Sequence, residues 1–230
     1  MKKTIDEHAK RFSEKAEEYD ESKSPEYRAC ADLVVEHAAP DAGDTVLDLG
    51  CGTGAIALAL APDAGEQSSP SDQPQADHAE RVIGRDISEG MLEQAERKAA
   101  DRGLGDVEFG EGRFREPNVP DDADVDVVTT NFAMHHLSDA EKREAIDEVA
   151  AREPDRFVLG DVMFFDEPDP AEPFYSPTVD DPATVGVLSD ALTDAGFALT
   201  AVEMVHEQVG VLAAERIPAT DGERVPDADG

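Results

Sequence analysis

The sequence predicts an α/β protein in which a mostly parallel sheet ends in an antiparallel hairpin. Segments of strand character alternate with helical segments through most of the 230 residues, which is the pattern of a parallel sheet with helices on both faces. Runs such as 46–47 and 127–128 are continuously apolar, as expected for strands that are buried on both faces. The last two apolar runs, 197–205 and 209–214, are joined by a short turn, so they should pair antiparallel.

Two helices should precede the sheet. Residues 4–20 form a charged helical pattern with one apolar face, made of Phe12, Ala16 and Tyr19 at i, i+4 and i+7. A second helix is expected at 24–37, because it opens with a capping serine followed by a proline at the first helical position.

Strands and helices then alternate up to the hairpin. The predicted strands are 44–49, 81–86, 107–109, 125–130 and 156–162. The predicted helices are 55–61, 88–103, 138–151 and 182–194, with a capping serine at 88 and a capping box at 138–141. Sheets of this kind bind ligands beyond the carboxyl ends of their strands, so we expect the site at that edge.

Two segments are predicted to be disordered. The stretch 65–74 contains no Leu, Ile, Val or Phe, so it cannot bury enough apolar surface to offset the entropy of ordering it. We interpret 63–79 as a disordered surface insertion and 218–230, which is rich in Asp, Gly and Pro, as a disordered tail. This leaves an N-terminal helical part at 1–40 and a sheet domain at 41–217.

The composition is strongly acidic, with 54 Asp and Glu against 20 Lys and Arg and a net charge of −34. Because the carboxylates are spread along the chain, we interpret them as halophilic adaptation to a salt-filled cytoplasm, where screening weakens self-repulsion. Phosphate binding needs Lys and Arg, so the charge argues against nucleic acid, although halophilic adaptation would hide a basic patch. We find no export signal, no run that could span a membrane and only two cysteines, and therefore expect a cytoplasmic protein.

A glycine-rich turn joins the first predicted strand to its helix: Asp48-Leu49-Gly50-Cys51-Gly52-Thr53-Gly54. Glycines there permit positive φ and a close approach of ligand to backbone, and the helix N-terminus offers N–H donors. Asp86, at the end of the next strand, is placed to accept hydrogen bonds from ribose hydroxyls. These features predict a ligand that contains a nucleoside.

The same turn also fits the dinucleotide pattern, because Gly50, Gly52 and Ala55 have its spacing. An NAD(P)-binding oxidoreductase is therefore an alternative, and a tight turn without any ligand is another. Asp48 favours a different ligand, since a buried carboxylate repels a pyrophosphate but suits a sulfonium or an amino group.

Residues 46–54, together with Gly84-Arg85-Asp86-Ile87-Ser88 and Met91-Leu92, resemble the class I S-adenosylmethionine-dependent methyltransferases. Segments 131–137 and 12–20 are similar to the type 11 or 25 subgroup, which acts mainly on small molecules. The resemblance extends from about 8 to 214 outside the insertion. It implies a Rossmann-like fold with a mostly parallel seven-stranded sheet, N-terminal helices that cover the cofactor pocket, S-adenosyl-L-methionine as cofactor and a small-molecule acceptor.

The resemblance also implies which residues bind the cofactor: Tyr19, Asp48, Gly50, Cys51, Gly52, Thr53, Gly54, Asp86, Ile87, Met91, Gly112, Arg113, Phe114, Asn131 and Phe132. It places the turn at the methionine end and Asp86 at the ribose. One position departs from the family, which often has an adenine-binding Asp where this chain has Arg113. Arg113 cannot accept a hydrogen bond, though it could stack on the purine, and Glu111 or a backbone carbonyl would accept instead.

Three residues are candidates for catalysis. His135 and His136 follow the fourth strand and Asp161 ends the fifth. A general base is needed only if the acceptor must lose a proton. Alternatively, the histidines shape the loop and Asp161 bonds its backbone. No Cys and His spacing indicates a zinc site, and we expect no metal.

We therefore predict an S-adenosylmethionine-dependent methyltransferase that transfers a methyl group to a small-molecule acceptor by in-line displacement. Three alternatives stay open: an RNA or protein acceptor, an NAD(P)-binding oxidoreductase, and a module that binds cofactor without turnover. The sequence makes no prediction of the oligomeric state.

Overall fold

The computed structural model describes residues 5–62, 78–120, 123–167 and 173–218. The predicted disordered insertion at 63–79 and tail at 218–230 fall almost wholly outside the described residues. At the end of that insertion, Ala79 is buried, and its N–H donates to Leu60 O at 3.1 Å. Ala79 is therefore part of the core just before the second strand begins.

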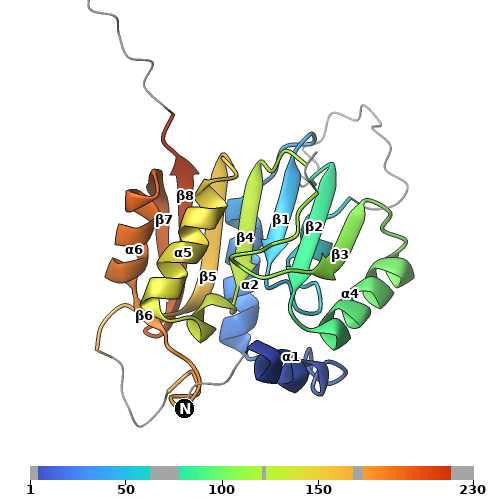
Figure 1. Cartoon of the computed structure of the whole chain (residues 1–230), viewed down its shortest axis with the longest axis horizontal. Coiled ribbons are helices and arrows are strands. Elements are labelled where there is room, and N and C mark those ends of the chain that lie inside the picture. Colours follow the sequence, from blue (N-terminus) through green and yellow to red (C-terminus); the bar gives the residue numbers. More distant parts are fainter. Residues whose placement is uncertain (1–4, 63–77, 121–122, 168–172, 219–230) are drawn as a thin grey trace, which may run out of the picture.

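Seven strands of the described chain form one mixed sheet in the spatial order β3-β2-β1-β4-β5-β8-β7 (Figure 1). They are β1 (Thr45–Leu49), β2 (Arg81–Asp86), β3 (Val107–Glu111), β4 (Val127–Asn131), β5 (Arg156–Phe164), β7 (Phe197–His206) and β8 (Val209–Arg216). The first five are parallel, and β8 runs antiparallel to both β5 and β7. A short additional strand, β6 (Ala183–Thr184), pairs with β5. The predicted fold class is confirmed.

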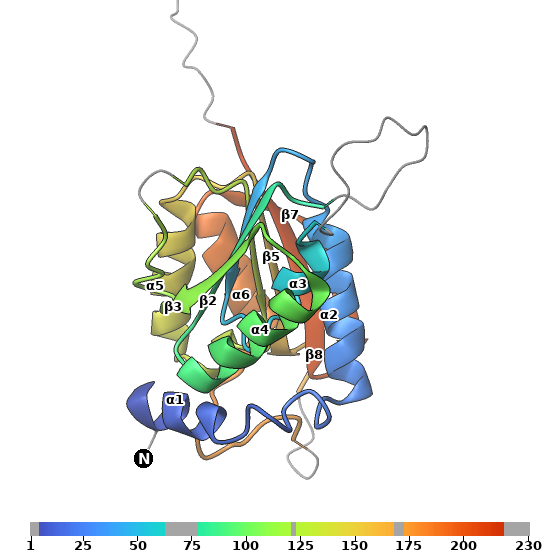
Figure 2. The ribbon, with the colours of Figure 1, turned by 90° about the vertical axis from the view of Figure 1, so that its right-hand side faces the viewer.

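Helices cover both faces of the sheet. One face carries α2 (Pro25–Ala38), α3 (Ala57–Leu60) and α4 (Glu89–Arg102), and the other carries α5 (Asp139–Ala150) and α6 (Val185–Asp194) (Figures 1 and 2). Two apolar clusters fill the space between the layers. Val158 lies in one and its neighbours Phe157 and Leu159 in the other, because successive residues of a strand point to opposite faces.

The first helix is shorter than predicted. α1 spans Ile5–Ser13 rather than 4–20, and turns follow to about residue 22. Ser13 Oγ lies 2.9 Å from Ser88 Oγ and accepts the Gly90 N–H at 3.2 Å. These contacts fix the end of α1 against the N-terminus of α4, at the lower edge of the sheet in Figure 1. Helical periodicity alone could not reveal an end that is set by residues 75 positions away.

The remaining boundaries differ little from the prediction, with one exception. The helix expected at 182–194 begins at Val185, because Ala183 and Thr184 pair with β5. Thr184 then caps α6 by accepting the Val187 N–H at 3.2 Å. The caps at Ser24 and Ser88 and the capping box at 138–141 are confirmed.

Two further features complete the description. A 3₁₀ turn, η1 (Met134–His136), follows β4 and was not predicted. Within the described parts of the chain, none of the helices has the length and apolar character that crossing a membrane requires.

Candidate functional site

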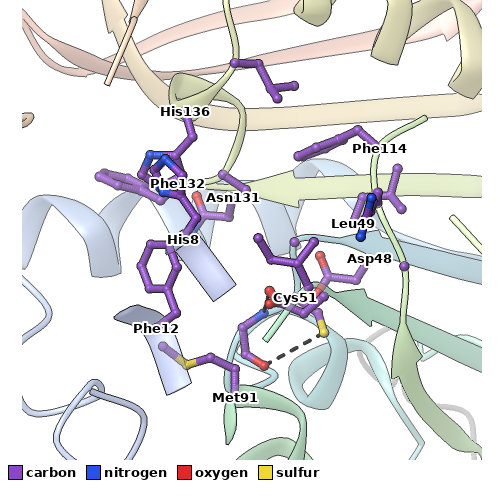
Figure 3. A pocket seen from close by; sticks show the side chains of 18 of the residues that line it. His8, Phe12, Asp48, Leu49, Cys51, Met91, Phe114, Asn131, Phe132 and His136 are labelled. Carbon is purple, nitrogen blue, oxygen red and sulfur yellow. Dashed lines mark hydrogen bonds between the residues drawn. The ribbon is translucent and has the colours of Figure 1, made fainter. Parts of the chain in front are cut away.

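A cavity of about 570 Å³ lies at the carboxyl ends of β1, β2 and β4. The strand order reverses between β1 and β4, and this is the edge where such sheets bind ligands. The N-terminal segment and the loop after β4 complete the walls. Figure 3 shows His8, Phe12 and His136 on one side of the cavity and Phe114 on the opposite side.

The turn after β1 requires its glycines. Gly50, Gly52 and Gly54 have φ angles of +69°, +53° and +82°, a region that residues with a Cβ rarely adopt. A Cβ on Gly50 would lie 2.5 Å from the Cβ of Ala133, so the turn also packs tightly against the loop after β4. Cys51 lies between them, and burial raises the pKa of its thiol well above the usual value. The thiol therefore stays protonated and is not a nucleophile.

Asp86 connects β2 to this turn. Its Oδ2 accepts the Gly52 N–H at 2.9 Å and its Oδ1 accepts the Ser88 N–H at 2.8 Å. Burial raises the pKa of Asp86, although the backbone N–H groups of Ser88, Gly52 and Ile87 act in the opposite direction. Each oxygen keeps a lone pair, and the side chain lines the cavity. The carboxylate can therefore accept two further hydrogen bonds from a ligand.

Asp48 is a second carboxylate in the cavity wall and is only 1% exposed. Its Oδ1 accepts the Thr129 hydroxyl at 3.0 Å and its Oδ2 accepts the Ala57 N–H at 3.2 Å. Burial raises the pKa of Asp48 to about 7 in spite of these bonds. A cationic ligand group beside it would favour the ionised form.

Asn131 is the last residue of β4 and Phe132 follows it, and both line the cavity (Figure 3). The side-chain oxygen and nitrogen of Asn131 are buried and have no partner in good hydrogen-bond geometry among the described residues, although Asn131 interacts with Tyr27 and opposes the rise in the Tyr27 pKa that burial causes. Phe132 has a φ of +54°, and its ring packs 4.9 Å from that of Tyr27 between centroids. An unpaired amide and a strained backbone at one point are typical of a binding site.

The N-terminal segment is fastened over the cavity. Asp20 accepts the Thr53 hydroxyl at 2.6 Å and pairs with Lys23 and Lys98. Burial would raise the pKa of Asp20, but the hydrogen bonds from these partners outweigh it and lower the pKa. Tyr19 lines the cavity beside them, and burial, followed by the nearby Asp86, raises its pKa to about 12. The phenol is therefore neutral at physiological pH.

The residues predicted to surround the adenine all line the cavity: Ile87, Met91, Gly112, Arg113 and Phe114. Arg113 is an exposed residue in a tight turn, whose N–H donates to Glu116 O at 2.9 Å. Glu111, the suggested replacement acceptor for the adenine amino group, is exposed and is not part of the cavity wall.

Two predicted turn residues do not line the cavity. The Thr53 hydroxyl bonds Asp20 and so fastens the N-terminal segment. Gly54 is buried, and a Cβ there would lie 3.1–3.2 Å from the side chains of Leu58 and Ala95. Both residues therefore stabilise the turn without lining the cavity.

The structure separates the three predicted catalytic residues. His136 lines the cavity, whereas His135 and Asp161 do not. His135 Nδ1 lies 2.6 Å from Asp161 Oδ1, and Asp161 also accepts the N–H groups of His135 at 2.9 Å and Val162 at 2.7 Å. Asp161 therefore bonds the backbone of the loop after β4, as in the alternative interpretation given for it above.

Three residues of the site were not predicted as such. Asp180 Oδ1 lies 2.8 Å from His136 Nδ1, the His8 ring centroid lies 5.0 Å from that of His136, and Asp20 contacts the glycine turn. Asp180 and His136 are 44 positions apart, and Asp20 and Thr53 are 33 apart. No spacing rule within one helix or strand connects such residues, so the sequence carries no signal for them.

Residues 46–152 match a family model described as a methyltransferase domain. The uncharacterized methyltransferase YcgJ of Bacillus subtilis is 32% identical over 152 residues, which are 65% of this chain and 53% of that protein. Its crystal structure superposes with a TM-score of 0.59 at 26% identity, covering 75% of this chain and 70% of that one. The aklanonic acid methyltransferase DauC of Streptomyces is 31% identical over 46% of this chain and 43% of its own length.

One ligand-bound structure shares the fold. Magnesium protoporphyrin IX methyltransferase from Synechocystis, solved with bound S-adenosylmethionine, has a TM-score of 0.59 and 20% identity, covering 83% of this chain and 79% of that one. The chain spans about half the length of the curated relatives it matches. These findings support S-adenosylmethionine as the cofactor. Residues 46–152 are therefore similar to a methyltransferase domain, and the chain has the Rossmann-like fold of the class I S-adenosylmethionine-dependent enzymes.

Proposed function

We propose that this chain transfers the methyl group of S-adenosylmethionine to a small-molecule acceptor. The observation that carries the proposal is the cavity beyond β1 and β2, where two carboxylates, the buried Asp48 and the half-buried Asp86, flank the glycine turn. A ligand with a cationic end and ribose hydroxyls gives each carboxylate the partner it lacks. The unpaired amide of Asn131 supports a third polar contact in the same wall.

The residues present suit the parts of this cofactor. In the proposed arrangement Asp48 faces the ammonium end, Asp86 accepts from the ribose, and Met91 and Phe114 contribute apolar contacts near the adenine. The bound cofactor supplies a methyl carbon activated by the sulfonium and a neutral thioether as leaving group. The task of the chain is then to align the acceptor with that carbon and to exclude water.

The covered cavity favours a small acceptor. Its volume of about 570 Å³ falls in the range of small-molecule sites, about 300–1,000 Å³. The wall on the side of α1 carries the rings of His8, Phe12 and His136 (Figure 3), which suit an acceptor with an apolar, planar part. DauC and the magnesium protoporphyrin IX methyltransferase are named for small organic acceptors, in line with this proposal.

Calorimetric titration with S-adenosylhomocysteine and, separately, with NAD tests the cofactor. We expect binding of S-adenosylhomocysteine and none of NAD; tight NAD binding without the former would make the chain an oxidoreductase. Methyl transfer from labelled cofactor into a size-fractionated cell extract then tests the acceptor. Label in the small-molecule fraction supports the proposal, and label confined to the protein or RNA fraction contradicts it.

We also propose that the acidity is halophilic adaptation to a salt-filled cytoplasm. With a net charge of −34, self-repulsion should destabilise the fold until salt screens it. The melting temperature should rise as KCl increases from 0.1 M, where the Debye length is about 10 Å, to 1 M, where it is about 3 Å. A melting temperature that does not change over this range would contradict the proposal.

A further inference from the structure

Two adjacent histidines follow β4, and each faces a carboxylate through its Nδ1. His135 pairs with Asp161 at 2.6 Å, and His136 pairs with Asp180 at 2.8 Å. The two rings lie 4.0 Å apart between centroids. Only His136 lines the main cavity, where Figure 3 shows it beside His8 and Phe132. The two pairs look alike chemically, but they occupy different places in the site.

We propose that Asp180 is a positioning residue that keeps the proton of His136 on Nδ1 and so leaves Nε2 free to take a proton from the acceptor. The acceptor class that follows is a molecule that reacts through a weakly acidic O–H or N–H group. This inference rests on the proposed function and deepens it.

Asp180 is held in the orientation that this role needs. Its Oδ2 accepts the Ser176 N–H at 2.7 Å while its Oδ1 faces His136. Burial would raise the pKa of Asp180, but the hydrogen bonds from His136 and from the Ser176 backbone outweigh it and lower the pKa. An ionised carboxylate can only accept hydrogen bonds. The proton in this bond therefore belongs to His136 Nδ1.

The surroundings of His136 keep its ring neutral. The titratable groups that face it are His8 on α1, His135 on η1, Asp161 on β5 and Asp180 in the connection before β6. Burial, followed by the neighbouring His135, lowers the pKa of His136, and the two carboxylates oppose that shift without reversing it. A neutral ring with its proton on Nδ1 has a lone pair on Nε2, as a general base requires.

In the proposed step the acceptor loses one proton to His136 and gains the methyl group. The acceptor O–H or N–H proton moves to Nε2 of His136, and the lone pair of that heteroatom attacks the methyl carbon. The bond between that carbon and sulfur breaks, and its electron pair stays on sulfur. The positive charge of the sulfonium is thus replaced by the charge of an imidazolium, which Asp180 stabilises through the Nδ1 hydrogen bond. The imidazolium later releases its proton to water.

His135 and Asp161 provide a matched control. Both oxygens of Asp161 accept backbone N–H groups, from Val162 and from His135 itself. His135 does not line the main cavity but a more open neighbouring hollow of about 480 Å³, which Asp180 and Phe132 also line. We expect this second pair to stabilise the loop and not to decide which ring nitrogen of His136 carries the proton, because neither of its members bonds His136 Nδ1.

The test is to determine which ring nitrogen of His136 carries the proton in the Asp180→Asn variant. The Ser176 N–H needs an oxygen at the position of Oδ2, so the amide NH₂ must face His136 Nδ1 and donate to it. The proton of the ring then moves to Nε2, and the base is lost without a change in shape. Long-range ¹H–¹⁵N spectra of histidine-labelled protein report this directly. With six histidines in the chain, a His136→Gln variant assigns the signal.

In the wild-type protein we expect the Nδ1–H tautomer of His136, and in Asp180→Asn the Nε2–H tautomer. Asp161→Asn should leave His136 as the Nδ1–H tautomer, even if it lowers the melting temperature. A wild-type Nε2–H tautomer, or no change in Asp180→Asn, would overturn the proposal. Side-chain ligand atoms of His135, His136 and Asp180 lie within 4.8 Å of one another, so a stoichiometric divalent metal ion bound to them would overturn it as well.

Measurements of methyl transfer and of cofactor binding distinguish a failure of this inference from a failure of the proposed function. Once an acceptor has been found in the labelled extract, Asp180→Asn should lower kcat by about 10²–10⁴-fold and leave the affinity for S-adenosylhomocysteine unchanged. The wild-type rate should rise with pH through the pKa of His136, because the base must be neutral. If Asp180→Asn keeps the wild-type kcat, the role of Asp180 is refuted; if the wild-type chain binds no S-adenosylhomocysteine, the proposed function itself fails.

Discussion

Replacing Asp48 with Asn should remove a buried charge and keep the local hydrogen bonds. The amide oxygen can accept the Ala57 N–H, and the amide NH₂ can donate to the Thr129 hydroxyl, whose own proton is free to turn away. Because Asn and Asp have nearly the same shape, the variant isolates the carboxylate charge. We expect it to stabilise the protein without cofactor and to weaken cofactor binding.

The size of the stability gain follows from the pKa of Asp48, which burial raises from 3.8 to about 7. Because the folded-state pKa is raised, wild-type stability is highest below the unfolded pKa and is lost as the pH rises through the folded pKa. At 1.36 kcal/mol per pH unit, the raised pKa of Asp48 costs the folded protein about 2 kcal/mol at pH 5, where only the unfolded chain is ionised, and about 4 kcal/mol at pH 8. Asn does not titrate, so Asp48→Asn should exceed the wild type in stability by these amounts.

Urea denaturation of both proteins at pH 5 and pH 8 in concentrated KCl, without cofactor, measures the difference. Calorimetry with S-adenosylhomocysteine should show the variant binding more weakly by about 1.5–3 kcal/mol, the range for hydrogen bonds to charged groups. Wild-type binding should also tighten as the pH rises through 7. The reasoning is refuted if the variant is less stable at pH 8, if the stability difference does not depend on pH, or if the affinity is unchanged.

Three further substitutions test other parts of the site. Asp86→Ala should weaken S-adenosylhomocysteine binding by about 1–3 kcal/mol, because it leaves donors unpaired; an unchanged calorimetric affinity would mean that the ribose lies elsewhere. Gly50→Ala forces a Cβ to 2.5 Å from the Cβ of Ala133 at a φ of +69° and should therefore lower the melting temperature. The control is Gly43→Ala, whose Cβ would have no atom within 4 Å and should barely change the melting temperature. Equal effects of the two substitutions would contradict the steric argument. Asp20→Asn should speed proteolysis of the N-terminal segment at pH 7. Because the pKa of Asp20 is lowered, the difference in cleavage rate between variant and wild type should shrink as the pH falls below about 4. Equal cleavage rates at pH 7 would show that the ion pairs of Asp20 do not hold the segment in place.

The elements that the sequence predicted well depend on neighbouring residues. Ser24, Ser88 and Ser138 cap helices through residues three positions away, and the glycines at 50, 52 and 54 are required by their own φ angles. Alternation of strand and helix, with short turns, leaves few topologies that bury the apolar strands. Local signals of this kind are enough to predict the sheet, the edge at which ligands bind and most of the cavity wall.

The predictions that were wrong concern positions whose structure is set by residues far away in the sequence. α1 ends at Ser13 because Ser88 and Gly90 meet it there, and 182–184 leave the predicted helix because β5 offers a strand partner. Whether His135 or His136 faces the cavity depends on the 3₁₀ turn after β4, which puts one ring against Asp161 and the other against Asp180.

The sequence by itself determined the fold class, the glycine-rich turn and the two carboxylates that flank it, because these depend on spacing, backbone freedom and burial within single elements. Only the tertiary structure decided which histidine lines the cavity, which carboxylate faces that histidine and which contacts hold the N-terminal segment over the cavity. Those roles arise from contacts between residues that are far apart in the chain, and a contact of that kind exists only once the sheet has formed and brought the ends of its strands together.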